Sequence, residues 1–245
     1  MSTEPVCRSE LIEEGRLLTL TLSNGPSNEI TPAILTAIGR TLDELEGMSS
    51  VRAVLVQGDG KVFSKGFDVR VIEEYPTMAA HRRGLLLGND VCSRIAASRL
   101  PWIAAINGHC LGAGLELALA CHLRLGIEGA RFGLPELSRG LLPGLGGVHR
   151  LTRLVGRAKA LELILSGALI SGEEALQIGL INRLIPKNSF GDAVLAFARN
   201  ITSVAPGLVA DVLEIANTAE CAGEEGSVVE TMECVLSHWR PRASA

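Results

Sequence analysis

One stretch of this chain, residues 107–147, constrains its fold more than any other, because it places two glutamates among glycine-rich turns. Glu116 follows the glycine-rich run at residues 108–114 and stands in an otherwise apolar segment. A carboxylate in such a segment costs free energy unless it has a partner or a function. Glu136 precedes a second glycine cluster at residues 143–147. Two carboxylates beside turns with little side-chain cover predict paired acid/base chemistry next to exposed backbone amides.

The first glycine-rich run leads into an apolar segment that is typical of a helix. The first amides of a helix have no partner within it, and the positive end of its dipole points at whatever lies there, so this turn favours an anionic oxygen. Glu116 stands three positions after Ala113, which places its carboxyl on about the same helix face as that amide. A second exposed turn at residues 63–68 offers another amide, and two such donors would form an oxyanion hole.

The spacing of apolar residues predicts alternating strands and helices around this stretch. Residues 17–22 alternate apolar side chains with threonine, as a strand does, and Thr31 with Pro32 predicts a helix start. The capping pattern at residues 171–174 predicts another. Further elements are expected as strands over residues 51–56, 101–106 and 180–185, and as a helix over residues 79–97.

This order indicates an α/β body that ends near a change in pattern after Pro186, beyond which only helical periodicity remains. We therefore expect two regions. Residues 1–186 would form the α/β body with the active site, and residues 187–245 a helical region. Its apolar positions are expected to be buried between subunits: Val204, Leu208, Val212 and Ile215.

Composition limits the class of function. The chain has 245 residues, of which 47% are hydrophobic and 20% charged, which is ample for a substantial core. Its net charge of −4 and the lack of a Lys/Arg-rich run argue against nucleic-acid binding. With neither a targeting pattern nor a long apolar run, we expect a soluble cytoplasmic protein without membrane contact. The 6 cysteines form no Cys-x-x-Cys pair and no metal-like group with the 5 histidines, so we expect free thiols and no metal.

Several motifs together resemble the enoyl-CoA hydratase/isomerase (crotonase) superfamily. They stand at residues 62–69, 103–121 and 132–147, in the family's order and with matching spacing, and the block at residues 171–182 is similar as well. The resemblance implies an α/β spiral of ββα turns with a C-terminal all-helical trimerisation region. It also implies an acyl-CoA thioester as substrate, a homotrimer or homohexamer, and no cofactor, since CoA is part of the substrate.

The resemblance also implies roles for individual residues. Phe67 and Ala113 match the positions whose amides form the oxyanion hole, and Glu116 and Glu136 match the glutamates with which hydratases of the family add water to a 2,3-trans-enoyl thioester. The positions implied in substrate or CoA binding are Lys65, Gly66, Asp68, Arg70, Gly112, Pro143 and Gly144. Lys65 and Arg70 are expected near the CoA phosphates.

Alternative interpretations remain for these residues. Glu116 could be a buried structural carboxylate bonded to backbone amides, and Glu136 could cap the segment that follows it. His109 and His122 lie near the predicted site in sequence, but a lone histidine is more often structural; His122 also stands where the family usually has Asp. Isomerases of the family commonly keep only the position of Glu136, so both glutamates together favour hydration.

Three further alternatives concern the whole activity. The protein could be an isomerase, dehydratase or hydrolase acting on another acyl thioester. The thioester could also be one of acyl-carrier protein, because the short segment after Trp239 is not expected to form the longer last helix with which members of the family cover CoA. It could be a catalytically silent oligomeric scaffold, although both glutamates argue against that. An RNA-binding member of the fold is disfavoured by the acidic balance.

Overall fold

The computed structural model describes residues 6–219, in which two β-sheets and their helices enclose two apolar clusters, one on each face of the larger sheet. The larger sheet has the strand order β1-β2-β3-β5-β7-β10. Its strands are β1 (Val6–Ile12), β2 (Leu17–Ser23), β3 (Ala53–Gly58), β5 (Trp102–Ile106), β7 (Leu123–Ile127) and β10 (Arg183–Ile185). The hairpin of β1 and β2 is antiparallel, whereas every other neighbouring pair is parallel.

The smaller sheet has the order β4-β6-β8-β9 and consists of short strands. They are β4 (Val62–Ser64), β6 (His109–Leu111), β8 (Arg131–Gly133) and β9 (Ile170–Ser171), with only the β8–β9 pair antiparallel. The chain passes from β3 to β4, from β5 to β6 and from β7 to β8, and each time continues into a helix. This is the ββα order that the family resemblance implies.

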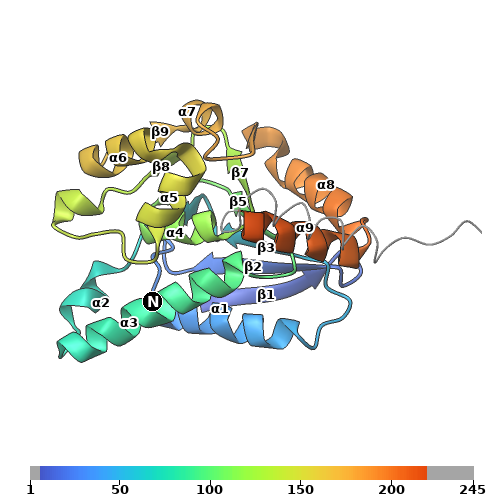
Figure 1. The fold of residues 1–245 in the computed structure, drawn as a ribbon, viewed down its shortest axis with the longest axis horizontal. Helices are drawn as coiled ribbons and strands as arrows, with labels where there is room; N and C mark the ends of the chain where they lie inside the picture. The colour runs from blue at the N-terminus through green and yellow to red at the C-terminus, as the bar shows by residue number, and fades with distance from the viewer. Residues whose placement is uncertain (1–5, 220–245) are drawn as a thin grey trace, which may run out of the picture.

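The helices connect and cover these sheets (Figure 1). The α-helices are α1 (Pro32–Leu45), α2 (Val69–Glu73), α3 (Met78–Ala96), α4 (Ala113–Ala120), α5 (Gly147–Val155), α6 (Arg157–Ser166), α7 (Gly172–Gln177), α8 (Phe190–Thr202) and α9 (Pro206–Ala219), and the short 3-10 helices are η1 (Glu136–Arg139) and η2 (Lys187–Ser189). The predicted starts are confirmed at two of them. The Thr31 hydroxyl accepts from the Ile34 amide and the Ser171 hydroxyl from the Glu174 amide, each satisfying an end donor.

The larger sheet is covered on both faces. Leu18, Leu20 and Leu22 of β2 pack in the core cluster that includes α1, whereas Leu17 packs on the other face together with Phe190 of α8. Figure 1 shows α1 and α3 running alongside each other at one side of the sheet, with α8 on the other. Because parallel strands covered on both faces are apolar along their whole length, the uninterrupted apolar run in β5 fits its central place.

Two features differ from the sequence expectation. The last strand is shorter than residues 180–185, because the amides of Leu180 and Ile181 both donate to the Ala175 carbonyl and so belong to the turn that follows α7. The strands of the smaller sheet, β1 and β7 were not expected; the smaller strands span only 2 to 3 residues and show no readable alternation.

The region after residue 186 begins with a helix that is part of the body's packing. Phe190, Val194 and Ala198 of α8 are buried against the larger sheet. The last part of the predicted helical region, residues 220–245, lies outside the described residues. Within residues 6–219 no single helix is long and apolar enough to cross a bilayer; α8 and α9 meet the criterion only as a pair, and they are bent by 98° at their junction.

Candidate active site

The turn between β6 and α4 presents an unpaired amide to the candidate site. Gly112 has φ 52° and ψ −131°, which L side chains rarely adopt, and its amide donates to the Gly133 carbonyl at 2.9 Å. The helix α4 then starts at Ala113, and all of its residues are buried. As the first residue of the helix, Ala113 has no carbonyl within it to accept its N–H. The positive end of the helix dipole therefore lies at this amide.

A second free amide belongs to Phe67. Gly66 has φ 117°, and its carbonyl accepts a hydrogen bond from the Ile30 amide at 2.8 Å. Two residues later, the Asp68 amide donates to the Ile30 carbonyl at 3.0 Å. This parallel bridge turns the Phe67 N–H to the side away from Ile30. A Cβ added to Gly66 would lie 3.8 Å from the Ala113 nitrogen, so the two turns lie close together. Within the described residues no loop or turn hydrogen bond uses either the Phe67 or the Ala113 amide as donor.

Glu116 is buried, and its carboxylate is held by the second glycine cluster. Its side chain is 1% exposed, and Oε1 accepts from the amides of Leu145 at 2.7 Å and Gly147 at 2.8 Å. Only glycine fits at position 147, because a Cβ there would lie 2.7 Å from Cγ of Glu116. The pKa of Glu116 is raised to about 7, mainly by burial; the charge of Glu136 also raises it, whereas the amides of Gly147, Leu145 and Gly144 lower it.

Glu136 lies across the start of α4, at the first position of η1. A Cβ added to Gly112 would lie 3.2 Å from its Oε1, so this carboxylate stands beside the turn that presents the Ala113 amide. Burial raises the pKa of Glu136. Both of its oxygens are buried, and neither has a hydrogen-bond partner in the described part of the chain. A buried carboxylate without a partner is costly in a folded protein, so its pairing with a ligand would explain it.

The predicted CoA-contact residues fall into two groups. Gly66 and Gly112 shape the turns described above, and Pro143 and Gly144 lie half-buried in the loop before α5. The remaining three, Lys65, Asp68 and Arg70, follow β4. Their part in binding stays a prediction.

Within that second group Arg70 already has a partner. Asp68 caps α2 and accepts two 2.8 Å bonds from the Arg70 guanidinium, which lowers the pKa of Asp68. Among these three residues, only Lys65 has an exposed side chain that makes no hydrogen bond to another described residue.

The two histidines near the site have structural roles. Nδ1 of His122 accepts from the Trp102 amide at 3.0 Å, and Nδ1 of His109 accepts from the Arg131 amide at 3.1 Å. Burial lowers the pKa of His122 to about 4, which keeps its ring neutral near pH 7. The expected free thiols are confirmed for the described cysteines, Cys7, Cys92, Cys110 and Cys121, whereas Cys221 and Cys234 lie outside the described residues.

Two residues of the site were not found from the sequence. Nδ2 of Asn89 in α3 donates to the Gly144 carbonyl at 2.7 Å, and Nη1 of Arg150 in α5 donates to the Leu145 carbonyl at 2.7 Å. Both hold the loop whose amides bind Glu116. No sequence motif marks Asn89, because its contact with Gly144 joins positions that are 55 residues apart.

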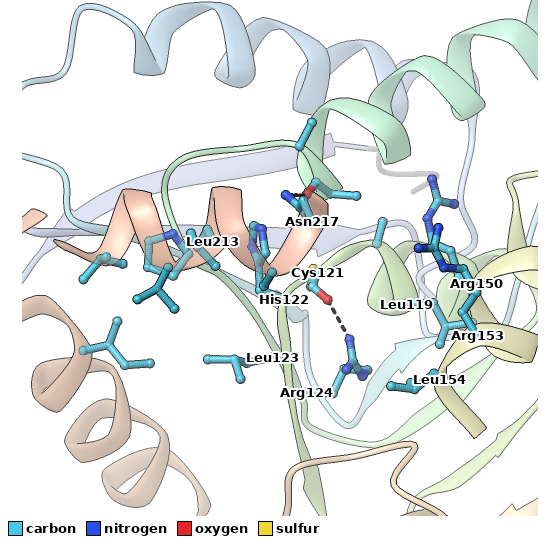
Figure 2. A pocket seen from close by; sticks show the side chains of 18 of the residues that line it. Leu119, Cys121, His122, Leu123, Arg124, Arg150, Arg153, Leu154, Leu213 and Asn217 are labelled. Carbon is cyan, nitrogen blue, oxygen red and sulfur yellow. Dashed lines mark hydrogen bonds between the residues drawn. The ribbon is translucent and has the colours of Figure 1, made fainter. Parts of the chain in front are cut away.

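A separate groove of about 1040 Å³ lies between α9 and the segment from α4 to β7 (Figure 2). Leu208, Val212 and Leu213 line it from α9, and neither glutamate borders it. The dashed line between Arg124 and Cys121 in Figure 2 marks the bond from the Arg124 guanidinium to the Cys121 carbonyl at 2.6 Å. Arg124 also binds two further backbone carbonyls, so its charge is used within the fold.

The fold and the paired carboxylates define an α/β protein whose site is built around the first turn of α4, and comparison with known proteins assigns its family. The family model for enoyl-CoA hydratase/isomerase matches residues 13–233. A probable enoyl-CoA hydratase of Bacillus subtilis is 39% identical over 215 residues, which covers 85% of this chain and 81% of that protein. A short-chain-enoyl-CoA hydratase of Clostridium acetobutylicum is 36% identical over 198 residues, covering 80% and 76%.

A solved structure of a putative enoyl-CoA hydratase from Thermobifida fusca in complex with CoA superposes with a TM-score of 0.85 at 26% identity, covering 94% of this chain and 91% of that one. The chain therefore belongs to the enoyl-CoA hydratase/isomerase (crotonase) family. Its expected fold class is confirmed, with two mixed sheets followed by C-terminal helices.

Proposed function

We propose that this protein is an enoyl-CoA hydratase, which adds water syn across the double bond of a 2,3-trans-enoyl-CoA thioester. The observation that carries the proposal is the pair of glutamates beside the start of α4: Glu116 is buried, and Glu136 is half-buried with both carboxylate oxygens covered. Glu116 and Glu136 both have raised pKa values, and the charge of one raises the pKa of the other. Two neighbouring carboxyls with raised pKa values suit a reaction in which one acts as base and the other as acid.

In the proposed reaction one carboxylate takes a proton from water as the water oxygen bonds to C3 of the enoyl group. The electron pair of the double bond moves toward the thioester, whose oxygen gains charge and is held by the amides of Phe67 and Ala113. The second, protonated carboxyl then gives its proton to C2. When the hydroxyacyl thioester leaves, the first carboxylate has gained a proton and the second carboxyl has lost one. Proton transfer with solvent then restores the starting protonation of both.

The relatives support this substrate class at the level of the family. Those compared above are a probable hydratase, a short-chain hydratase and a putative hydratase bound to CoA. The length and branching of the acyl chain are best determined with a panel of enoyl-CoA thioesters, followed by the loss of absorbance of the conjugated enoyl thioester. Running the same panel with acyl-carrier-protein thioesters separates the two carriers.

The first prediction concerns the two glutamates. Glu116→Gln and Glu136→Gln should each lower turnover by roughly 10²- to 10⁴-fold, because glutamine keeps the size of the side chain but transfers no proton. Thioester binding and folding should be nearly unchanged, which titration with a saturated acyl-CoA and circular dichroism would check. If only Glu136→Gln were inactive while Glu116→Gln kept near-normal activity, double-bond isomerisation would be the better assignment. If the wild-type protein turned over no thioester at all, the silent scaffold would replace the enzyme.

A further inference from the structure

The loop that holds Glu116 is itself held by a side chain from another helix. Nδ2 of Asn89 in α3 donates to the Gly144 carbonyl at 2.7 Å, and the Leu145 amide donates to Oε1 of Glu116 at 2.7 Å. The Gly144 carbonyl and the Leu145 N–H are the two ends of one peptide group. Asn89, this peptide and the Glu116 carboxylate therefore form one continuous chain of hydrogen bonds.

A hydrogen bond at one end of a peptide group strengthens the bond at its other end. The C–N bond has partial double-bond character, so a donor at the carbonyl oxygen draws electron density from the nitrogen and makes the N–H a better donor. The strengthened N–H favours the ionised carboxylate over the neutral acid. We propose that Asn89 is a positioning residue for Glu116, which orients the Gly144–Leu145 peptide and increases its preference for the ionised carboxylate.

The packing between α3 and this loop supports a fixed arrangement. Gly88, next to Asn89, has no side chain, and a Cβ there would collide with Cδ2 of Leu145. Gly144 packs in the same way, since its added Cβ would lie 2.9 Å from Cδ2 of Leu85. The missing side chains bring the loop against α3, where Asn89 can reach the carbonyl.

The second amide on Glu116 gives an internal comparison. The Gly147 N–H also binds Oε1, but the carbonyl of its peptide, that of Gly146, accepts from the Arg150 backbone at 3.0 Å. Asn89 thus acts on one of the two donors. Its effect on Glu116 should be partial.

A substitution at Asn89 leaves the ionisable groups around Glu116 unchanged. Glu136 faces it from η1, Cys92 from α3, and Arg150 from α5 through the Leu145 carbonyl. Asn89→Ala removes a neutral donor and alters none of these groups. A change in the proton affinity of Glu116 in this variant would then come from the peptide bonded to Asn89.

The test measures that proton affinity through stability, and so it does not depend on the proposed function. The free energy of unfolding is measured from pH 4 to pH 9 for the full chain and for Glu116→Gln, at one protein concentration, and their difference is plotted against pH. The difference levels off above the folded-state pKa of Glu116, which it thereby reports. The same difference is then measured between the Asn89→Ala variant and the double variant that carries both Asn89→Ala and Glu116→Gln.

We expect Asn89→Ala to increase the proton affinity of Glu116 about two- to fourfold, which raises its pKa by about 0.3 to 0.6. The matched control is Asn217→Ala, which removes an asparagine bond to the Ala96 carbonyl at the far end of α3 and should leave this pKa unchanged. Asn89→Asp has the same shape but replaces the donor with a negative charge, so it should raise the pKa of Glu116 further. This variant takes the place of Asn89→Ala if the alanine variant does not fold.

Two results would overturn the proposal: an unchanged Glu116 pKa in both Asn89 variants, or an equal shift in Asn217→Ala. The activity measurement is a separate arm, and only that arm depends on the proposed function. There, the limb of the pH profile of kcat/KM that belongs to Glu116 should move to higher pH by the same amount. A pKa shift in the stability data without any hydratase activity would leave the role of Asn89 standing and refute the proposed reaction alone.

Discussion

At the scale of the residue, Glu116 combines a structural and a chemical feature. Its Oε1 accepts two backbone amides, as a structural carboxylate would, yet burial still raises its pKa to about 7. The amides therefore offset only part of the cost of removing the charge from water. Glu136 is half-buried, and its two covered carboxylate oxygens have no hydrogen-bond partner among the described residues. A site that places two carboxyls in this way is expected to reduce stability in return for acid/base chemistry.

That cost gives a prediction for pH-dependent stability. The folded pKa of Glu116 lies near 7, above its ordinary value of 4.5, so the folded state binds more protons between these two values. Its stabilising contribution is complete below about pH 4.5 and is lost as the pH rises through 7. Glu116→Gln removes this loss while its side-chain oxygen still accepts both amides. At pH 8 the variant should be more stable by up to about 3 kcal/mol, measured by denaturant unfolding.

The control is Glu128→Gln, because Glu128 is exposed and its substitution should leave the pH dependence unchanged. A Glu116→Gln protein that is less stable than the wild type at pH 8 would show that the carboxylate is a net stabilising group.

At the scale of the element, α4 is a short buried helix whose start does the positioning. The left-handed Gly112 turns the chain out of β6, and the next residue, Ala113, is the first of the helix. Proline is tolerated at this first position because the N–H it lacks has no partner within the helix. The position of Ala113 thus permits a substitution that removes one amide and keeps the helix.

We expect Ala113→Pro to lower turnover by roughly 10²- to 10³-fold, since it removes one of the two proposed oxyanion donors. The paired variant is Phe67→Ala, which shortens the side chain but keeps the backbone amide and should retain most of the turnover. Both need a folded protein by circular dichroism. Wild-type turnover in folded Ala113→Pro would place the oxyanion hole elsewhere.

At the scale of the whole molecule, one apolar surface is left without cover by the described residues. Val204, Leu208 and Val212 are between 44% and 65% exposed, and all three line the groove in Figure 2. The largest apolar patch on a protein surface is often a site of interaction. The same residues were expected from the sequence to lie between subunits, and that assignment stays a prediction.

We expect the protein to be a trimer or hexamer at micromolar concentration, as measured by light scattering. Leu208→Glu should shift it toward smaller species, because a charge in the groove would be removed from water when subunits associate. Leu169→Glu is a matched control: Leu169 is an exposed leucine, 45% accessible, outside the groove. A wild-type monomer, or equal dissociation in both variants, would contradict this assignment.

Local patterns in the sequence were sufficient for several of the longer elements, among them β2 and α1, and they singled out the two glutamates. The Thr31 and Ser171 caps depend on atoms three residues apart, and the alternation in β2 reflects the two faces of a strand, so neighbouring residues contain both signals. The motifs around Glu116 and Glu136 indicated the family for the same reason.

Tertiary structure decided what those residues contact. Glu116 meets amides 29 and 31 positions away, and Asn89 meets a carbonyl 55 positions away. Contacts over such separations exist only once α3, α4 and the loop before α5 have packed together, and glycines without side chains let them approach. The short strands of the smaller sheet arise in the same way, because 2 or 3 residues form a strand only when a neighbour supplies the hydrogen bonds. The sequence by itself determined which groups this protein can use, whereas packing determined how tightly Glu116 holds its proton.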